Sequence, residues 1–219
     1  MVAMKPIWLI LFIASAVTLF AGILFDLHML YLTAKPLLMI TLLFYFISAS
    51  KGYPSWRFYV MAALVFSWGG DVFLMQDGMF TAGLVSFLVA HIFYITAYQK
   101  TGAASGELRP LDIIKFVLFG AVVMWVLYPG LGGMLIPVLA YMLVLLSMGV
   151  WAHKRRGATP MASFVMVSTG AMLFVISDGL IAINKFAWEV PAERFLVMST
   201  YIAAQYFIVQ GLLKHEAAR

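Results

Sequence analysis

The chain has 219 residues, of which 64% are apolar and only 11% are charged, whereas about a quarter of an average soluble domain is charged. This composition excludes a soluble globular protein, because too little polar surface would remain to cover the apolar residues. The net charge of +5 does not indicate nucleic-acid binding, since the basic residues stand in short gaps between apolar runs. The absence of cysteine excludes disulfides, thiolate nucleophiles and cysteine-ligated zinc. We therefore predict an all-α integral membrane protein.

Apolar runs bounded by charges, proline and glycine predict eight transmembrane helices. Most runs have the roughly 17–25 residues that are needed to cross a hydrocarbon core of about 30 Å. We expect the first to be an uncleaved helix, because its apolar stretch exceeds that of a signal peptide and no small-x-small site follows. The second is the shortest, and it either extends at one of its ends or lies oblique to the membrane. We expect Lys35-Pro36 to open it at the outer interface, because proline is favoured in a first helical turn. In chain order the helices are expected near Pro6–Phe25, Pro36–Ala49, Phe58–Met75, Phe80–Tyr98, Leu111–Tyr128, Met134–Ala152, Ala162–Ile183 and Phe195–Leu213.

The lysines and arginines predict the orientation. If the N-terminus is cytoplasmic, 11 basic residues lie on the cytoplasmic side and 3 on the other. Basic residues favour cytoplasmic loops, so we expect both termini in the cytoplasm and the run HKRRG in a cytoplasmic loop that anchors the topology. The cytoplasmic set is Lys5, Lys51, Arg57, Lys100, Arg109, Lys115, Lys154, Arg155, Arg156, Lys214 and Arg219, and the opposite set is Lys35, Lys185 and Arg194.

Asp71 and Asp178 fall inside the third and seventh predicted helices. An ionisable group at membrane depth costs several kcal/mol unless it is paired, protonated or next to water, so a functional role is the default interpretation. The alternative is a hydrogen bond that joins helices. Asp71 precedes Met75 by four residues and Asp178 precedes Ile183 by five. At 1.5 Å per residue, both should lie roughly 6–8 Å inside the outer helix ends.

The surroundings of the two aspartates resemble each other, with small residues preceding each carboxylate in SWGGD and FVISD. We therefore expect a single transmembrane domain, 1–219, with an internal repeat of four helices, 1–105 and 106–219. An even number of helices per repeat makes the two copies parallel, which would bring both carboxylates to one central cleft. An offset of 107 residues, which superposes the two aspartates, also pairs Tyr94-Ile95 with Tyr201-Ile202, and Ala97 with Ala204.

Helical spacing places further polar and aromatic side chains in stripes that suggest a site. These stripes comprise Ser67, Gly70, Asp71 and Leu74; Gly83, Phe87, His91, Tyr94 and Tyr98; Gly170, Phe174, Ser177, Asp178 and Ile181; and Met198, Tyr201 and Gln205.

Two interpretations stay open for the candidate binding residues. His91 is the one histidine inside a predicted helix, and it either serves the site or forms an interhelical hydrogen bond. The same alternatives hold for Tyr94, Tyr201 and Gln205. Lys35 either holds a lipid phosphate close to the carboxylates or extends to the headgroup region with no further role.

Several catalytic motifs are absent from the sequence. It contains no GxSxG elbow, no HExxH and no glycine-rich phosphate loop. A serine triad and a histidine-rich zinc site are therefore poorly supported, and we expect neither a metal nor another cofactor.

Five segments stand out together: KPLL, SWGGDVFLM, GLVSFLVAHIFYITAY, GAMLFVISDGLIAINKF and YIAAQYFIVQG. This set resembles the YhhN family of membrane proteins, the lysoplasmalogenases. The resemblance implies an eight-helix enzyme that cleaves the vinyl ether bond of a lysophospholipid, giving a fatty aldehyde and a glycerophospho-ethanolamine or glycerophospho-choline. It also implies that Asp71 and Asp178 are the catalytic pair. We expect the protein to cross a bacterial cytoplasmic membrane several times, to be surrounded by membrane lipid and to have no nucleic-acid partner.

The residues agree with this chemistry, which needs a protonated carboxylic acid and a carboxylate. We expect a cleft open to the outer leaflet, with the lipid phosphate near Lys35 and a narrow slot formed by Gly70, Gly83 and Gly170. Two other classes remain: a transporter or proton relay that uses the buried aspartates, and a lipid-binding or structural protein with an inert pair.

Overall fold

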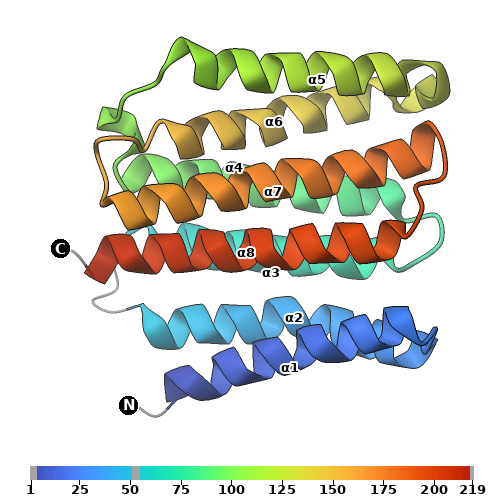
Figure 1. Ribbon diagram of the computed structural model, residues 1–219, viewed down its shortest axis with the longest axis horizontal. Helices are drawn as coiled ribbons and strands as arrows, with labels where there is room; N and C mark the ends of the chain where they lie inside the picture. The colour runs from blue at the N-terminus through green and yellow to red at the C-terminus, as the bar shows by residue number, and fades with distance from the viewer. Residues whose placement is uncertain (1–3, 51–54, 218–219) are drawn as a thin grey trace. The chain divides into compact units, whose positions relative to one another are not determined.

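A computed structural model describes residues 4–50 and 55–217, and the side chains from residue 7 onward. Within these ranges all regular secondary structure is helical, with eight α-helices and two short 3-10 helices (Figure 1). The predicted all-α class is thus confirmed. The α-helices are α1 (Met4–Leu24), α2 (His28–Ala49), α3 (Arg57–Leu74), α4 (Phe80–Lys100), α5 (Pro110–Leu131), α6 (Leu135–His153), α7 (Met161–Phe186) and α8 (Glu193–Ala217).

Seven segments of the described ranges are long and apolar enough to cross a membrane. One of them, Pro110–His153, contains both α5 and α6, which are joined by the 3-10 helix Gly132–Met134. Gly132 has a φ of +47°, a backbone conformation that a residue with a Cβ rarely adopts. The chain is therefore a multi-pass, all-α membrane protein.

The chain divides into two compact units, Met1–Tyr94 and Ile95–Arg219, and the division falls within α4. We call them unit 1 and unit 2. In unit 1, α1 packs along α2, and the Trp8 and Phe44 rings stack with their centroids 4.7 Å apart. The Ser86 hydroxyl on α4 donates a hydrogen bond of 2.6 Å to the Phe66 carbonyl on α3. Unit 1 is thus held together by apolar packing and by hydrogen bonds between helices.

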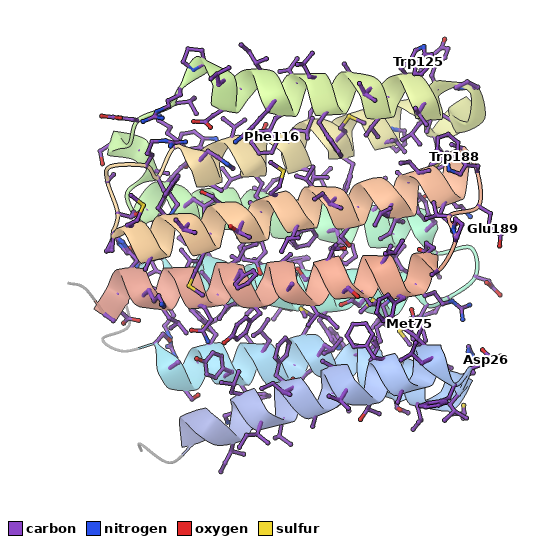
Figure 2. The ribbon with its side chains drawn as sticks, viewed as in Figure 1. Asp26, Met75, Phe116, Trp125, Trp188 and Glu189 are labelled. Atoms are coloured by element: carbon purple, nitrogen blue, oxygen red, sulfur yellow. The ribbon has the colours of Figure 1, made fainter. Side chains whose placement is uncertain are left out.

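Unit 2 contains the end of α4 and helices α5 to α8. Helices α7 and α8 lie side by side over most of their length (Figure 1). Phe116 lies between α5 and α6, where a Cβ on Gly149 would come within 2.5 Å of its ring (Figure 2). Trp125 and Trp188 are exposed and stand near one end of the unit (Figure 2). Tryptophan is enriched where a membrane meets water, so this end has the character of an interface.

The expected start of the second helix is wrong. Helix α2 begins at His28 and continues through Pro36, so Lys35 lies seven residues inside the helix rather than at its opening. A proline inside a membrane helix is tolerated because neighbouring groups can satisfy the carbonyl that it leaves without a donor. The other helices begin and end within a few residues of the prediction. Of the basic residues used for orientation, Lys51 and Arg219 lie outside the described residues, as does the side chain of Lys5.

Candidate active site

Asp71 lies in the last turn of α3, on the face that the helix buries. Its side chain is only 3% exposed, and Ser67 and Gly70 on the same face are also buried. The predicted stripe is therefore confirmed for these residues. Phe87 of α4 closes over this face, since a Cβ on Gly70 would lie 2.5 Å from its ring. Unit 1 thus holds a carboxylate away from lipid.

Lys35 is the second buried charged residue of unit 1, at 7% exposure. Its ammonium group lies 5.6 Å from the centroid of the Tyr31 ring, one helical turn earlier on α2. Such a contact stabilises the charge by about 0.5–2 kcal/mol, depending on how far it is removed from water. Lys35 thus packs against an aromatic ring of its own helix.

His91 and Tyr94 lie on α4 within unit 1, and both side chains are fully buried. Helical spacing puts them one turn apart on the face that also carries Phe87. Both polar side chains therefore face the interior of unit 1.

Asp178 lies inside α7, and its side chain is 8% exposed. The hydroxyl of Tyr141, on α6, donates a hydrogen bond to its carboxylate oxygen Oδ2. Tyr141 is itself buried. Unit 2 thus supplies Asp178 with a hydrogen-bond donor from a neighbouring helix.

Tyr201 and Gln205 lie one turn apart on α8 and are both buried. The Tyr201 ring meets the Phe174 ring of α7 edge to face, with centroids 5.5 Å apart. Nearby, the Ser177 hydroxyl donates a 3.2 Å hydrogen bond to the Val197 carbonyl of α8. These contacts place the two α8 residues against the same helix that carries Asp178.

The two aspartates stand at different distances from the ends of their helices. Asp71 is three residues before the last residue of α3, whereas Asp178 is eight before the last residue of α7. The expectation of equal distances is wrong, because α7 continues three residues past Ile183 to Phe186. The predicted site residues also divide between the units: Lys35, Asp71, His91 and Tyr94 belong to unit 1, and Asp178, Tyr201 and Gln205 to unit 2.

Comparison with known proteins identifies the family. Residues 30–212, most of the chain, match the YhhN family. The chain belongs to the YhhN family.

Three relatives of this chain are named lysoplasmalogenases. The chain is 32% identical to lysoplasmalogenase TMEM86B of Mus musculus, over 76% of this chain and 68% of the relative. It is 34% identical to lysoplasmalogenase TMEM86A of Bos taurus, over 68% of this chain and 62% of the relative. It is 28% identical to a lysoplasmalogenase of Mycobacterium bovis, over 71% and 60% respectively. The match thus spans somewhat under two thirds of the length of the last two relatives. No solved structure matches the chain.

The prediction that Gly70, Gly83 and Gly170 leave a narrow slot open beside them is wrong. A Cβ on Gly83 would lie 2.6 Å from the Leu74 side chain, and one on Gly170 would lie 2.8 Å from the Ala204 carbonyl oxygen of α8. With Phe87 over Gly70, the space beside each of these glycines is already filled. The glycines let helices approach closely, as small residues do in membrane proteins.

Sequence analysis missed two residues of this family member. Tyr141 was overlooked because a tyrosine in an apolar run gives no sign of a partner on another helix.

Arg155, in the basic run after α6, was assigned to a cytoplasmic anchor but is fully buried. Its guanidinium bonds the hydroxyls of Thr101 and Ser163 and lies 5.9 Å from the Tyr98 ring centroid. Burial lowers the pKa of Arg155 to about 10, so it still carries its charge at neutral pH.

Proposed function

We propose that this protein hydrolyses the vinyl ether bond of lysoplasmalogens, with Asp71 and Asp178 as an acid–base pair. The observation that carries the proposal is the burial of one aspartate in each unit, inside helices long and apolar enough to cross a membrane. Carboxylates in such places are expensive and are retained for function. The activity itself is supported by the relatives, which are lysoplasmalogenases.

The reaction needs two carboxyl groups in different protonation states. A proton transferred to the alkenyl carbon gives an oxocarbenium ion, water then adds, and the hemiacetal collapses to an aldehyde and an alcohol. A carboxylic acid supplies the proton, and a carboxylate stabilises the cation or activates the water. Two carboxyl groups that share a poorly solvated site resist ionising together, so one of them keeps its proton near neutral pH.

We assign substrate binding to the buried polar residues of both units. The ammonium group of Lys35 would hold the phosphate of the lysophospholipid, because a buried cation is best stabilised by an anionic partner. The buried side chains of His91, Tyr94, Tyr201 and Gln205 would line the site. This arrangement requires the aspartates to flank a single bond of the substrate.

We further propose that α1 to α8 each cross the membrane, with both termini in the cytoplasm and a bacterial cytoplasmic membrane as the location. Counting α5 and α6 as separate crossings follows from the turn at Gly132–Met134, which ends one helix before the next begins. The orientation is supported by one end of unit 2, where Arg156 and Lys115 pair with Asp112 at 3.1 and 3.2 Å. Basic residues favour the cytoplasmic side.

The experiment that tests the activity uses the purified protein in detergent or vesicles with an alkenyl lysophospholipid. We expect the release of a fatty aldehyde and one equivalent of glycerophospho-ethanolamine or glycerophospho-choline, depending on the headgroup of the lipid. The alkyl-ether analogue, which lacks the double bond, is the matched control and should not react, because it offers no alkene carbon to protonate. Cleavage of both lipids, or of neither, would contradict the proposal.

The absence of native cysteine allows a direct test of the paired site. A double variant with Asp71→Cys and Asp178→Cys should be joined by a short bifunctional thiol reagent. The two single variants, Asp71→Cys and Asp178→Cys, are the controls, and each should react with a monofunctional thiol reagent. Labelling of both single variants without crosslinking of the double variant would mean that the aspartates do not share a cleft.

A further inference from the structure

One end of unit 2 carries an excess of positive charge. The connections α4–α5 and α6–α7 lie at this end, and the Glu107 amide donates a 3.0 Å hydrogen bond to the Arg156 carbonyl that joins them (Figure 1). Residues 100–115 and 153–160 contain six lysines and arginines but only two acidic residues. The opposite end is balanced, since residues 128–135 and 184–194 contain two basic and two acidic residues.

Arg155, the middle residue of the run KRR, holds the α6–α7 connection in place. Its side chain is fully buried, and its two terminal nitrogens donate hydrogen bonds to the hydroxyls of Thr101, after α4, and Ser163, in the first turn of α7. The residues on either side, Lys154 and Arg156, are only half-buried. The buried arginine thus ties down the backbone from which two outer cations extend.

Three half-buried cations at this end each lie over an aromatic ring. We call Lys115, Lys154 and Arg156 the basic patch. A ring face stabilises a cation that has lost part of its hydration, as happens next to a bilayer. The distances from the charged group to the ring centroid are 5.3 Å for Lys115 over Phe116, 4.6 Å for Lys154 over Trp151, and 5.0 Å for Arg156 over Phe164.

The basic patch is only partly neutralised by the protein. The buried carboxylate of Asp112 pairs with Arg156 at 3.1 Å and with Lys115 at 3.2 Å. Lys154 forms no ion pair with a carboxylate in the described part of the chain. Three positive charges therefore share one negative charge, which leaves the patch complementary to an anionic partner.

Lipid-facing residues begin directly beside the basic patch. Leu111 and Ile114 on α5, and Met161 at the start of α7, are all exposed. Exposed apolar side chains at the ends of membrane helices meet the hydrocarbon of the bilayer, while lysines and arginines next to them reach the headgroups. The basic patch therefore has the depth of the lipid headgroups.

We propose that the basic patch binds the headgroups of anionic lipids at the boundary of unit 2. A basic residue near a membrane surface strengthens the attraction to anionic lipid about fivefold, so three of them with one counter-charge select for such lipids. The proposal does not depend on the function proposed above, because the ethanolamine and choline headgroups of that substrate are zwitterionic.

The test compares spin-labelled phosphatidylglycerol with spin-labelled phosphatidylcholine at the protein, in vesicles of unlabelled phosphatidylcholine. Electron spin resonance gives the ratio of the two association constants for lipids in contact with the protein. The wild type should favour phosphatidylglycerol at least about twofold, as an average over all contacting lipids. Combining Lys115→Gln with Lys154→Gln should bring the ratio close to one, while Arg156 still pairs with Asp112. Salt at 1 M should do the same, because it reduces the screening length to about 3 Å.

Two further variants are the controls. Combining Lys185→Gln with Arg194→Gln removes the same charge from the other end of unit 2 and should keep the wild-type ratio. Combining Lys115→Arg with Lys154→Arg retains the charge and should keep it as well. Equal association of both lipids with the wild type, or an equal loss in the Lys185 and Arg194 variant, would overturn the proposal. If the glutamine variant at the patch does not fold, a wild-type ratio that is unchanged at 1 M salt would overturn it.

Discussion

The surroundings of Asp71 in unit 1 differ from those of Asp178 in unit 2, although similar short sequences carry both residues. In unit 1, an aromatic side chain, Phe87, closes over the face of α3 beside the carboxylate. In unit 2, the carboxylate accepts a hydrogen bond from Tyr141 on α6, and the α8 backbone packs directly against Gly170 of α7. The described neighbours of the two motifs thus include a phenylalanine ring from α4 in unit 1 and a tyrosine hydroxyl from α6 in unit 2.

This difference suits a reaction that needs an acid and a base. Two carboxyl groups in identical surroundings would share a proton without a preference for either one. Different neighbours remove that equivalence, and pairs of ionisable groups with divergent environments are how enzymes assign acid and base roles. Substitutions in each unit can therefore be tested separately.

The largest expected effect comes from removing either carboxylate. Asp71→Asn and Asp178→Asn should each lower kcat/KM by at least about a hundredfold, the lower end for loss of a general acid or base. Aldehyde release by the purified variants measures the effect. Asp77→Asn and Glu189→Gln, which change exposed loop residues of units 1 and 2, are the matched controls and should keep their activity. Near-normal turnover in one aspartate variant would reduce that residue to a structural link between helices.

The burial of both aspartates could be predicted from the sequence, because a charged group at membrane depth cannot face lipid. Helical periodicity also predicted the buried faces around Ser67 and Gly170. These features depend on local sequence and on the membrane as a solvent, and a single helix is enough to infer them.

The rest depends on neighbours that no local pattern reveals. The Tyr141–Asp178 bond joins positions 37 residues apart on different helices. The position of Lys35 was misjudged because proline usually marks a first turn, whereas α2 runs through it. The burial of Arg155 was missed because a basic run resembles a solvated loop, whereas its two terminal nitrogens donate hydrogen bonds to the hydroxyls of Thr101 and Ser163.

The second expected effect is on stability. It compares Gly70 of α3 with Gly170 of α7, the helices that carry the two aspartates. A Cβ on Gly170 would meet the Ala204 carbonyl oxygen at 2.8 Å and the Ile208 amide nitrogen at 2.9 Å, so two helix backbones must separate. Gly170→Ala should therefore cost roughly 1–3 kcal/mol. Gly70→Ala should cost less, because it meets the Phe87 ring, a side chain that can move. Unfolding in detergent measures both.

Gly133→Ala is the control for these two variants, because nothing lies within 4 Å of the added Cβ. It should unfold at the same denaturant concentration as the wild type. An equal loss of stability in Gly70→Ala and Gly170→Ala would contradict this expectation. It would show that the Phe87 ring beside Gly70 is as rigid as the α8 backbone beside Gly170.

A smaller effect should follow from neutralising Lys35 in unit 1. If its ammonium group holds the lipid phosphate, Lys35→Met should raise KM about tenfold with little change in kcat, because that contact is equally strong in the ground and transition states. Lys185→Met changes an exposed lysine of unit 2 and should leave both constants unchanged. A fall in kcat without a change in KM would assign Lys35 to the chemistry rather than to phosphate binding.

The smallest effect, none at all, is expected from removing metal ions. Zinc in a hydrolase is held by cysteine, histidine and carboxylate ligands, usually three from the protein. The sequence has no cysteine, and among the described residues no three histidine, aspartate or glutamate side chains gather as a metal site would need. Activity should therefore be the same after treatment with EDTA or phenanthroline as before it. Loss of activity that returns on adding zinc would make His91 a candidate ligand. A bound metal ion, rather than the different neighbours of the two carboxylates, would then set their chemistry.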